Sequence, residues 1–350
     1  MKHLLLLTPG FAADEQDSRC IPPLQLFVQQ LQEQGRVKVS LISLHYPFKR
    51  EAAQWRGVDV YSCYSQGPFS RLRIWWQAYR WMKKIHREEP IHLIHSFWLT
   101  DAAWLGQRMS RRLNVPHWIT LMGQDVRPSN RYLRLLPPAK VNTIALSPFH
   151  HQRLLKTTSQ PAKALIPWGI AAADCPAPKA TKTIDLLGVG NLIGLKDYAT
   201  FIRLLDRLRE QHPHLRACIV GDGPLRTSLQ QQAKAADLEE HLQFTGYLPR
   251  AKVLDLMAQS RVLLHPSTFE SFGYIFLEAL ACGMSVVSRP VGIAEAGSRW
   301  RLADDEQGLY TALLEALAEA PHQDPVFPHP IEATMQAYHE LYDQSINISR

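Results

Sequence analysis

The residues of this chain that are best suited to chemistry lie in one stretch of its second half, residues 265–283. A predicted strand ends there in Pro-Ser, a short loop carries Glu270, and a helix is predicted to begin near Phe272 and to stop at a glycine. The first amides of a helix lack partners within the helix and carry partial positive charge, and Gly273 lets a ligand approach the main chain closely. We therefore predict that this helix end holds a phosphate or diphosphate group without a metal ion.

Two glutamates accompany this helix end. Glu270 stands ahead of the helix, and Glu278 is expected about 9 Å into it at 1.5 Å per residue. An ionised carboxylate only accepts hydrogen bonds, so each glutamate is expected to face hydroxyl groups of a ribose or a sugar. For either residue alone, a simpler explanation stays open. The helix dipole favours an acidic residue such as Glu270 at the helix start, and Glu278 would suit a solvated helix face.

The whole block carries more information than its parts. From Pro266 to Gly283 it follows Pro-Ser-x-x-Glu-x-Phe-Gly-x-x-x-Leu-Glu-Ala-x-Ala-x-Gly, which resembles the signature of glycosyltransferase family 4. Further stretches that fall in that family's order and spacing are 188–191 with Lys196, 219–224 and 244–248, with weaker echoes at 8–11, 94–95, 120–125 and 166–169. The resemblance covers nearly the whole chain and is most specific in the second half.

This resemblance implies a role for each matching residue. Glu270 is expected to contact the donor sugar, Glu278 the ribose, and the main-chain amides of Ser271, Phe272 and Gly273 the phosphate and sugar. Lys196 is expected to neutralise the diphosphate, whose charge grows as it leaves. The resemblance completes the donor site with Gly10, Phe11, Asn191, Gly221, Gly246, Tyr247 and Leu248, the last three lining the base pocket. No Asp-x-Asp dyad is present, so neither a metal nor a cofactor is predicted, and a nucleotide-diphosphate sugar is the donor substrate.

Two positions depart from the family pattern. Asn191 stands where an arginine is usual, and Met122 stands where a histidine is usual. A thioether supplies neither a proton nor a strong hydrogen bond, so support is expected from Asp125 or His95. The predicted catalytic residues are therefore Glu270, Lys196 and Asp125, and a catalytically impaired binding protein remains an alternative.

The resemblance also implies a hexosyl transfer with retention at the anomeric carbon. Attack is expected on the same face as the leaving group, with the leaving phosphate oxygen assisting deprotonation of the acceptor, so Glu270 is not assigned as a nucleophile. A more remote alternative is an NAD(P)-dependent oxidoreductase, because Gly188, Gly190 and Gly194 follow a predicted strand.

The elements that must position these residues alternate between β-type runs and helical patterns, which is typical of parallel α/β sheets. Strands are predicted at 3–7, 37–43, 92–95, 117–121, 143–146, 184–189, 216–220, 243–245, 262–265 and 285–288. Helices are predicted at 24–34, 72–87, 102–113, 198–211, 224–236, 251–259 and 272–282. The fold class is α/β, with two Rossmann-like domains facing a central cleft, the GT-B architecture that the resemblance implies.

The domain boundaries follow from the same pattern. Residues 1–168 are predicted to form an N-terminal acceptor domain, 169–183 a linker rich in Ala, Pro and Lys, and 184–325 the nucleotide-sugar domain. Apolar residues at 331, 335, 338 and 342 predict a helix over 330–346 that crosses back to the first domain. The acceptor is expected near residues 10–17 and 123–125 of the first domain.

Composition limits the remaining possibilities. A chain of 350 residues with 46% apolar and 20% charged residues suits two folded domains. Five scattered cysteines favour a reducing compartment, and the run Leu4–Leu7 is too short for export, so a cytoplasmic location is predicted. We expect a glycan, lipid-linked or small-molecule acceptor, in polysaccharide or glycoconjugate synthesis.

The net charge of +7 suits an anionic partner, but no nucleic-acid-binding motif is present, so nucleic acid is not predicted. Residues 70–89 combine basic and aromatic side chains. Leu72, Trp75 or Trp76, and Tyr79 fall at helical spacing, so most of the aromatic side chains are expected in the core. The basic positions left over suit peripheral contact with the inner face of a membrane, with a plain solvated face as the alternative.

Overall fold

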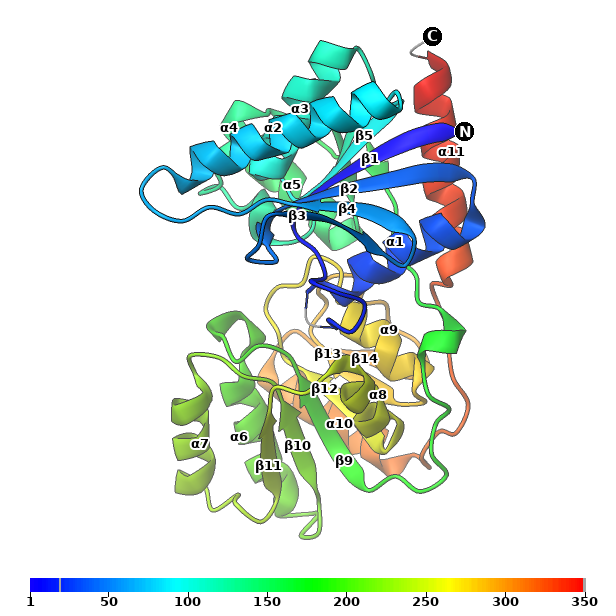
Figure 1. Ribbon diagram of the computed structural model, residues 1–350. Helices are drawn as coiled ribbons and strands as arrows, with labels where there is room; N and C mark the ends of the chain where they lie inside the picture. Colours follow the sequence, from blue (N-terminus) through cyan, green and yellow to red (C-terminus); the bar gives the residue numbers. More distant parts are fainter. Residues whose placement is uncertain (19, 349–350) are drawn as a thin grey trace. The chain divides into compact units, whose positions relative to one another are not determined.

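The chain divides into two compact units, each with its own sheet (Figure 1). The computed structural model describes residues 1–18 and 20–348. The first unit comprises Met1–Trp168 with the C-terminal segment from Glu332, and the second comprises Gly169–Ile331. In this described part of the chain, no helix is long and apolar enough to cross a membrane.

The first unit is built on a mostly parallel sheet with the order β3-β4-β2-β1-β5-β6-β7-β8. Here β3 pairs antiparallel with β4, and the other neighbours run parallel. The strands are β1 (Lys2–Gly10), β2 (Val37–Tyr46), β3 (Glu51–Trp55), β4 (Val58–Ser62), β5 (Leu93–Phe97), β6 (His117–Thr120), β7 (Asn142–Ala145) and β8 (Ala164–Leu165). The helices are α1 (Pro22–Gln34), α2 (Ser70–Glu88), α3 (Asp101–Leu113), α4 (Tyr132–Leu135), α5 (Pro148–Thr158) and α11 (Ile331–Ile348).

Both faces of the central strand β1 are buried. Successive side chains of a strand point to opposite faces, so a strand covered on both sides is an uninterrupted apolar run. Leu5 and Leu7 pack with α2 and α3, which lie side by side on one face (Figure 1). The run Leu4–Leu7 therefore lies in the central strand of this sheet.

A buried polar network joins α11 to the other face of this sheet. His95 Nδ1 lies 2.6 Å from the Tyr342 hydroxyl, and His95 Nε2 lies 2.7 Å from Thr120 Oγ1. The Tyr338 hydroxyl lies 3.2 Å from Thr120 Oγ1 and accepts from Trp168 Nε1. This network gives the buried ring of His95 hydrogen-bonding partners at both nitrogens.

We predict that Tyr342→Phe lowers the free energy of unfolding by about 1–3 kcal/mol, because it leaves a buried imidazole nitrogen without its partner. Chemical denaturation measures this difference. The control is Tyr310→Phe, whose hydroxyl meets Gln211 at an exposed site and whose loss is expected to change the stability by less than about 0.5 kcal/mol. Equal effects of the two substitutions would show that the network adds nothing to stability.

Two buried histidines of this unit make its stability depend on pH. Burial lowers the pKa of His95 well below its ordinary value, and burial lowers the pKa of His117 to about 3. The folded state holds both rings neutral, so their contribution is complete above about pH 6.5, where the unfolded rings are neutral too, and is lost as the pH falls.

We predict that each of these two histidines removes about 2 kcal/mol of stability between pH 7 and pH 5, because the unfolded chain binds the proton first. Denaturation midpoints across this range measure the slope. His95→Gln or His117→Gln should flatten it, and an unchanged slope in both variants would contradict the assignment.

The second unit holds a sheet with the order β11-β10-β9-β12-β13-β14, in which all neighbours run parallel. Its strands are β9 (Ile184–Val189), β10 (Ala217–Val220), β11 (Leu242–Gly246), β12 (Ser260–His265), β13 (Ser285–Ser288) and β14 (Trp300–Leu302). Its helices are α6 (Tyr198–Arg209), α7 (Arg226–Ala235), α8 (Arg250–Ala258), α9 (Tyr274–Ala281) and α10 (Glu306–Ala318).

The stretch predicted as a linker packs within the second unit. It contains a 3-10 helix over Ala172–Asp174. Ile170 is buried and pairs with Pro330, and the Tyr274 hydroxyl donates to the carbonyl of Gly169. The beginning of this stretch is thus ordered by α9 and by the segment that precedes α11.

Candidate functional site

The strand order of the second unit defines one position where ligands are expected. The chain runs outward from β9 through β10 to β11 and then returns to β12 on the other side of β9, so its direction reverses between β9 and β12. Ligands of open α/β sheets bind in the crevice at the carboxyl ends of the strands at such a switch point. The loops leaving these two strands carry Lys196 and Glu270 respectively.

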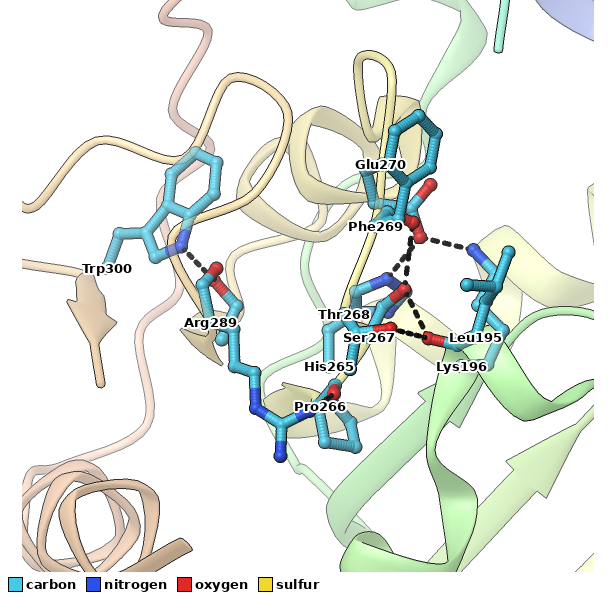
Figure 2. A network of polar contacts seen from close by, with 11 residues as sticks. Leu195, Lys196, His265, Pro266, Ser267, Thr268, Phe269, Glu270, Arg289 and Trp300 are labelled. Carbon is cyan, nitrogen blue, oxygen red and sulfur yellow. Dashed lines mark hydrogen bonds and ion pairs between the residues drawn. The ribbon is translucent and has the colours of Figure 1, made fainter. Parts of the chain in front are cut away.

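Hydrogen bonds tie the two loops together. The Thr268 amide donates to the carbonyl of Leu195 at 2.8 Å, and the Ser267 hydroxyl donates to the same carbonyl at 3.0 Å. Figure 2 shows these contacts beside the side chain of Glu270. The loop with Lys196 is therefore held against the loop with Glu270 by its main chain, independently of charge.

Glu270 lies between two basic side chains (Figure 2). Its Oε1 accepts from Lys196 Nζ and lies 2.8 Å from His265 Nε2. Burial opposes ionisation of this carboxyl, but Lys196 and His265 outweigh it and lower the pKa to about 2. Glu270 is therefore ionised at neutral pH, and its carboxylate contacts both the ammonium of Lys196 and the imidazole of His265.

His265, the last residue of β12, was not among the predicted site residues. Its ring is buried, and burial lowers its pKa while the hydrogen bond to Glu270 raises it. The available signal was its position directly before the Pro-Ser of the motif, at the carboxyl end of a strand. His265 and Glu270 are only five residues apart, but their spacing alone does not show that the loop turns the two side chains toward each other.

The tip of α9 differs slightly from its prediction. The helix begins at Tyr274 and not near Phe272, because Gly273 adopts a left-handed conformation with φ of 85°. A β-carbon at Gly273 would lie 2.4 Å from the ring of Phe276, so a side chain is excluded there. The side chain of Phe272 is buried, which leaves its main chain as the group able to meet a ligand.

Glu278 is buried on α9 and pairs with Arg250, the first residue of α8. Arg250 Nε donates to Glu278 Oε1 at 2.8 Å, and their side chains are 23% and 11% exposed. Burial raises the pKa of the Glu278 carboxyl, and Arg250 pulls it down. The simple explanation of Glu278 as a solvated face residue is therefore wrong, and Arg250 is a partner that the sequence motif did not indicate.

The other predicted donor residues of this unit follow strands β9, β10 and β11. Asn191 is exposed after β9. A β-carbon at Gly221 would lie 1.9 Å from the carbonyl oxygen of Gly190, so glycine lets the loops after β9 and β10 touch. Gly246 ends β11 with the Arg226 guanidinium beside it, and Tyr247 is 46% exposed. Leu248 is half-buried. These residues share the carboxyl edge of the sheet with Lys196 and Glu270.

Another cation reaches the loop that carries Lys196. Arg289 follows β13, lies 3.0 Å from Asp197 Oδ2 and donates to the carbonyl of Pro266 at 2.7 Å. The sequence pattern has Asn191 at the position where a second cation was expected. Arg289 is a basic residue that the fold, not the motif, brings to this edge.

The remaining predicted residues belong to the first unit. Gly10 ends β1, and the ring of Phe11 is buried edge-on against Trp55, so only the main chain of Phe11 can meet a ligand. Asp125 is 6% exposed, and its carboxylate accepts from the amides of Leu99, Met122 and Gly123.

These contacts bear on two sequence-based expectations, and the catalytic role of Asp125 stays a prediction. Asp125 orders the loop after β6 with its carboxylate, which is a structural task that residue type alone did not indicate. His95 is fully buried in the network that binds α11, so it is not an exposed group that replaces the histidine missing at Met122.

Two family profiles match this chain. The profile for glycosyl transferases group 1 matches residues 175–296, and the profile for glycosyl transferase 4-like proteins matches residues 20–147. A curated relative, the phosphatidylinositol N-acetylglucosaminyltransferase gpi3 subunit of Schizosaccharomyces pombe, is 32% identical over 117 residues, which are 33% of this chain and 26% of the relative. The chain thus spans about a quarter of the length of the first curated relatives it matches.

Solved structures match over the full chain. A sucrose-phosphate synthase from Thermosynechococcus elongatus has a TM-score of 0.76 at 17% identity, covering 98% of this chain and 99% of that one. The Anabaena protein Alr3699/HepE in complex with UDP-glucose has a TM-score of 0.68 at 19% identity, covering 99% and 96%.

Two units, each with its own largely parallel α/β sheet, and the likeness to these solved structures define the fold class as that of the GT-B glycosyltransferases. With both profiles matched, the chain belongs to the glycosyltransferases of the family 4 type.

Proposed function

We propose that this chain transfers a sugar from a nucleoside diphosphate sugar to an acceptor hydroxyl, with retention at the anomeric carbon and without a bound metal ion. The observation that carries the proposal is the contact of Lys196 and His265 with Glu270 at the switch point of the second sheet. A half-buried cation and carboxylate at that position suit an anionic leaving group attached to a hydroxyl-rich sugar.

In this proposal each group of the second unit meets a different part of the donor. Lys196 and the main-chain amides ahead of α9 bind the diphosphate, and Glu270 accepts from the sugar hydroxyls. Glu278, held by Arg250, accepts from the ribose, and the segment Gly246–Leu248 lines the base.

The transfer itself breaks the bond between the anomeric carbon and the diphosphate oxygen. The acceptor oxygen forms its bond to the anomeric carbon on the same face, and its proton passes to the leaving diphosphate. Lys196 stabilises the charge that the diphosphate gains, which is where a fixed cation acts most strongly. Glu270 already accepts from Lys196 and lies against His265, which favours a positioning task for it over nucleophilic attack.

Known relatives guide the choice of donor and acceptor. The Anabaena relative was solved with UDP-glucose, and the yeast relative is named for transfer of N-acetylglucosamine to phosphatidylinositol. We therefore propose a UDP-sugar as the first donor to test and a glycan or lipid-linked acceptor, in surface polysaccharide or glycoconjugate synthesis. The cytoplasmic location and the absence of a cofactor remain predictions.

A thermal-shift and calorimetric screen of UDP, GDP, ADP and their sugars tests this function. Ligand binding to the folded state raises the melting temperature with affinity and concentration, so the correct base should stand out. Sugar release from the bound donor should follow without added metal. Donor binding without any turnover would identify a catalytically impaired binding protein. A response to NADH and to no diphosphate would support an oxidoreductase.

A further inference from the structure

Helix α2 of the first unit presents an apolar stripe to solvent. Its inward face buries Ile74, Ala78, Met82 and Ile85. The helical spacing predicted that most of the aromatic side chains here lie in the core, and Trp76 is an exception. Three large apolar side chains at the start of the helix, spaced three and four residues apart, are 63%, 59% and 55% exposed: Phe69, Leu72 and Trp76.

The same outer stripe becomes cationic along the second half of the helix. Arg80, Lys83 and Arg87 continue the three- and four-residue spacing, and all three are exposed. The helix therefore joins an apolar end to a basic end on one solvent-facing side, over a length of about 27 Å. Such a side pairs membrane-inserting residues with residues that bind anionic headgroups.

A hollow beside the basic end gathers further cations. It has a volume of about 690 Å³ and is lined by α2, α3 and the segment before β3. Among the described residues, its lining holds no carboxylate; the basic members are Arg50, Arg80, Lys83, Lys84, His86, Arg87 and Arg112. Glu88 approaches from the helix end and lies 3.7 Å from Lys84.

Trp81 stands in this hollow with cations near its ring. Arg50 lies 5.9 Å and Lys84 lies 5.5 Å from the ring centroid, and within the described part of the chain the buried indole Nε1 has no hydrogen-bond partner. A phosphate oxygen would accept from this N–H and neutralise the surrounding cations. The hollow thus offers both charge and an unused donor to an anionic headgroup.

We propose that the outer face of α2 docks on an anionic lipid surface. Phe69, Leu72 and Trp76 enter the boundary between headgroups and acyl chains, and the basic end with its hollow binds lipid phosphates. Nucleic acid accounts for the cations alone, whereas a lipid surface accounts for the exposed apolar stripe in line with them. The proposal concerns the first unit and does not depend on sugar transfer.

Cosedimentation of the full chain with vesicles tests the proposal. We expect binding to phosphatidylcholine vesicles that contain phosphatidylglycerol and little binding to phosphatidylcholine alone. The variant Arg80→Glu/Lys83→Glu/Arg87→Glu should lose about 100-fold in affinity or more, because each juxtamembrane cation contributes about a factor of five. Leu72→Ser/Trp76→Ser should lose at least about tenfold, because two apolar side chains leave the interface.

A matched variant separates local binding from net charge. Lys140→Glu/Lys156→Glu/Lys252→Glu changes three exposed lysines elsewhere and has the same charge difference, so it should bind nearly as the parent does. Equal loss in this variant, or no vesicle binding by the parent, would overturn the proposal. So would displacement of the vesicles by single-stranded RNA together with full binding by Leu72→Ser/Trp76→Ser. Cooperative thermal unfolding near the melting temperature of the parent shows that the α2 variants are folded, and this control does not depend on the proposed function.

Discussion

Lys196→Met should reduce the affinity for the preferred nucleoside diphosphate by about 10- to 100-fold and slow sugar release by a further 100-fold or so. The ammonium is 19% exposed and lies on the carboxylate of Glu270, so it is an already positioned cation in a partly dry site. Methionine keeps the length of the side chain and removes its charge. The rate should fall more than the affinity, because the leaving diphosphate carries more charge in the transition state than in the bound donor.

Calorimetry with the diphosphate and a coupled assay of its release measure the two effects separately. The nucleoside without phosphates should bind parent and variant equally, because Lys196 is expected to meet the diphosphate alone. Lys252→Met changes an exposed lysine of the same unit and is the matched control. If Lys196→Met weakens nucleoside and diphosphate alike, the lysine acts on the fold of the site and not on the leaving group.

Most of the second sheet was predictable from sequence, because all its strands except β14 are short apolar runs separated by helical patterns. The predicted strands 184–189 and 285–288 match β9 and β13 at both ends. The pair of loops at the switch point was also predictable in principle, since the carboxyl ends of neighbouring parallel strands share one edge. This is how Lys196 and Glu270, 74 positions apart, come to touch.

Elements without such a pattern were missed. Strand β3 exposes its middle residues and lies at the sheet edge, and β14 is three residues long, so neither shows the buried run that marks a central strand. Helix α10 was missed although Asp305 caps it by accepting from the Gly308 amide. The hairpin of β3 and β4 depends on pairing with β2, which local preference does not report.

In the candidate site, too, the local sequence motif indicated some residues, whereas their partners depend on tertiary packing. The motif indicated Glu270 and Glu278, but not that His265 faces the first or that Arg250 pairs with the second. These partners lie at a strand end and at the start of another helix, so only packing brings them to the glutamates. Asp125 shows the converse, since the sequence indicated its carboxylate but not that it accepts from the amides of Leu99 and Gly123.

Arg250→Met should lower the free energy of unfolding by about 3–5 kcal/mol, because it leaves the buried carboxylate of Glu278 without its cation. The guanidinium stem is largely buried as well, and methionine retains part of its apolar packing. Most of the loss is therefore expected from the unpaired charge, and the double variant Arg250→Met/Glu278→Gln should recover much of it. Denaturation of the parent, both single variants and the double variant measures the coupling.

The pH dependence of this loss distinguishes charge from packing. Burial already raises the pKa of Glu278, and without Arg250 its folded pKa should rise further above the unfolded value. A group with a raised folded pKa loses its contribution as the pH rises through that value, so the deficit of Arg250→Met relative to the parent should be small near pH 5 and full near pH 8. If the deficit is the same at both pH values and persists in the double variant, Arg250 stabilises the fold by packing. The ion pair with Glu278 would then contribute nothing to stability.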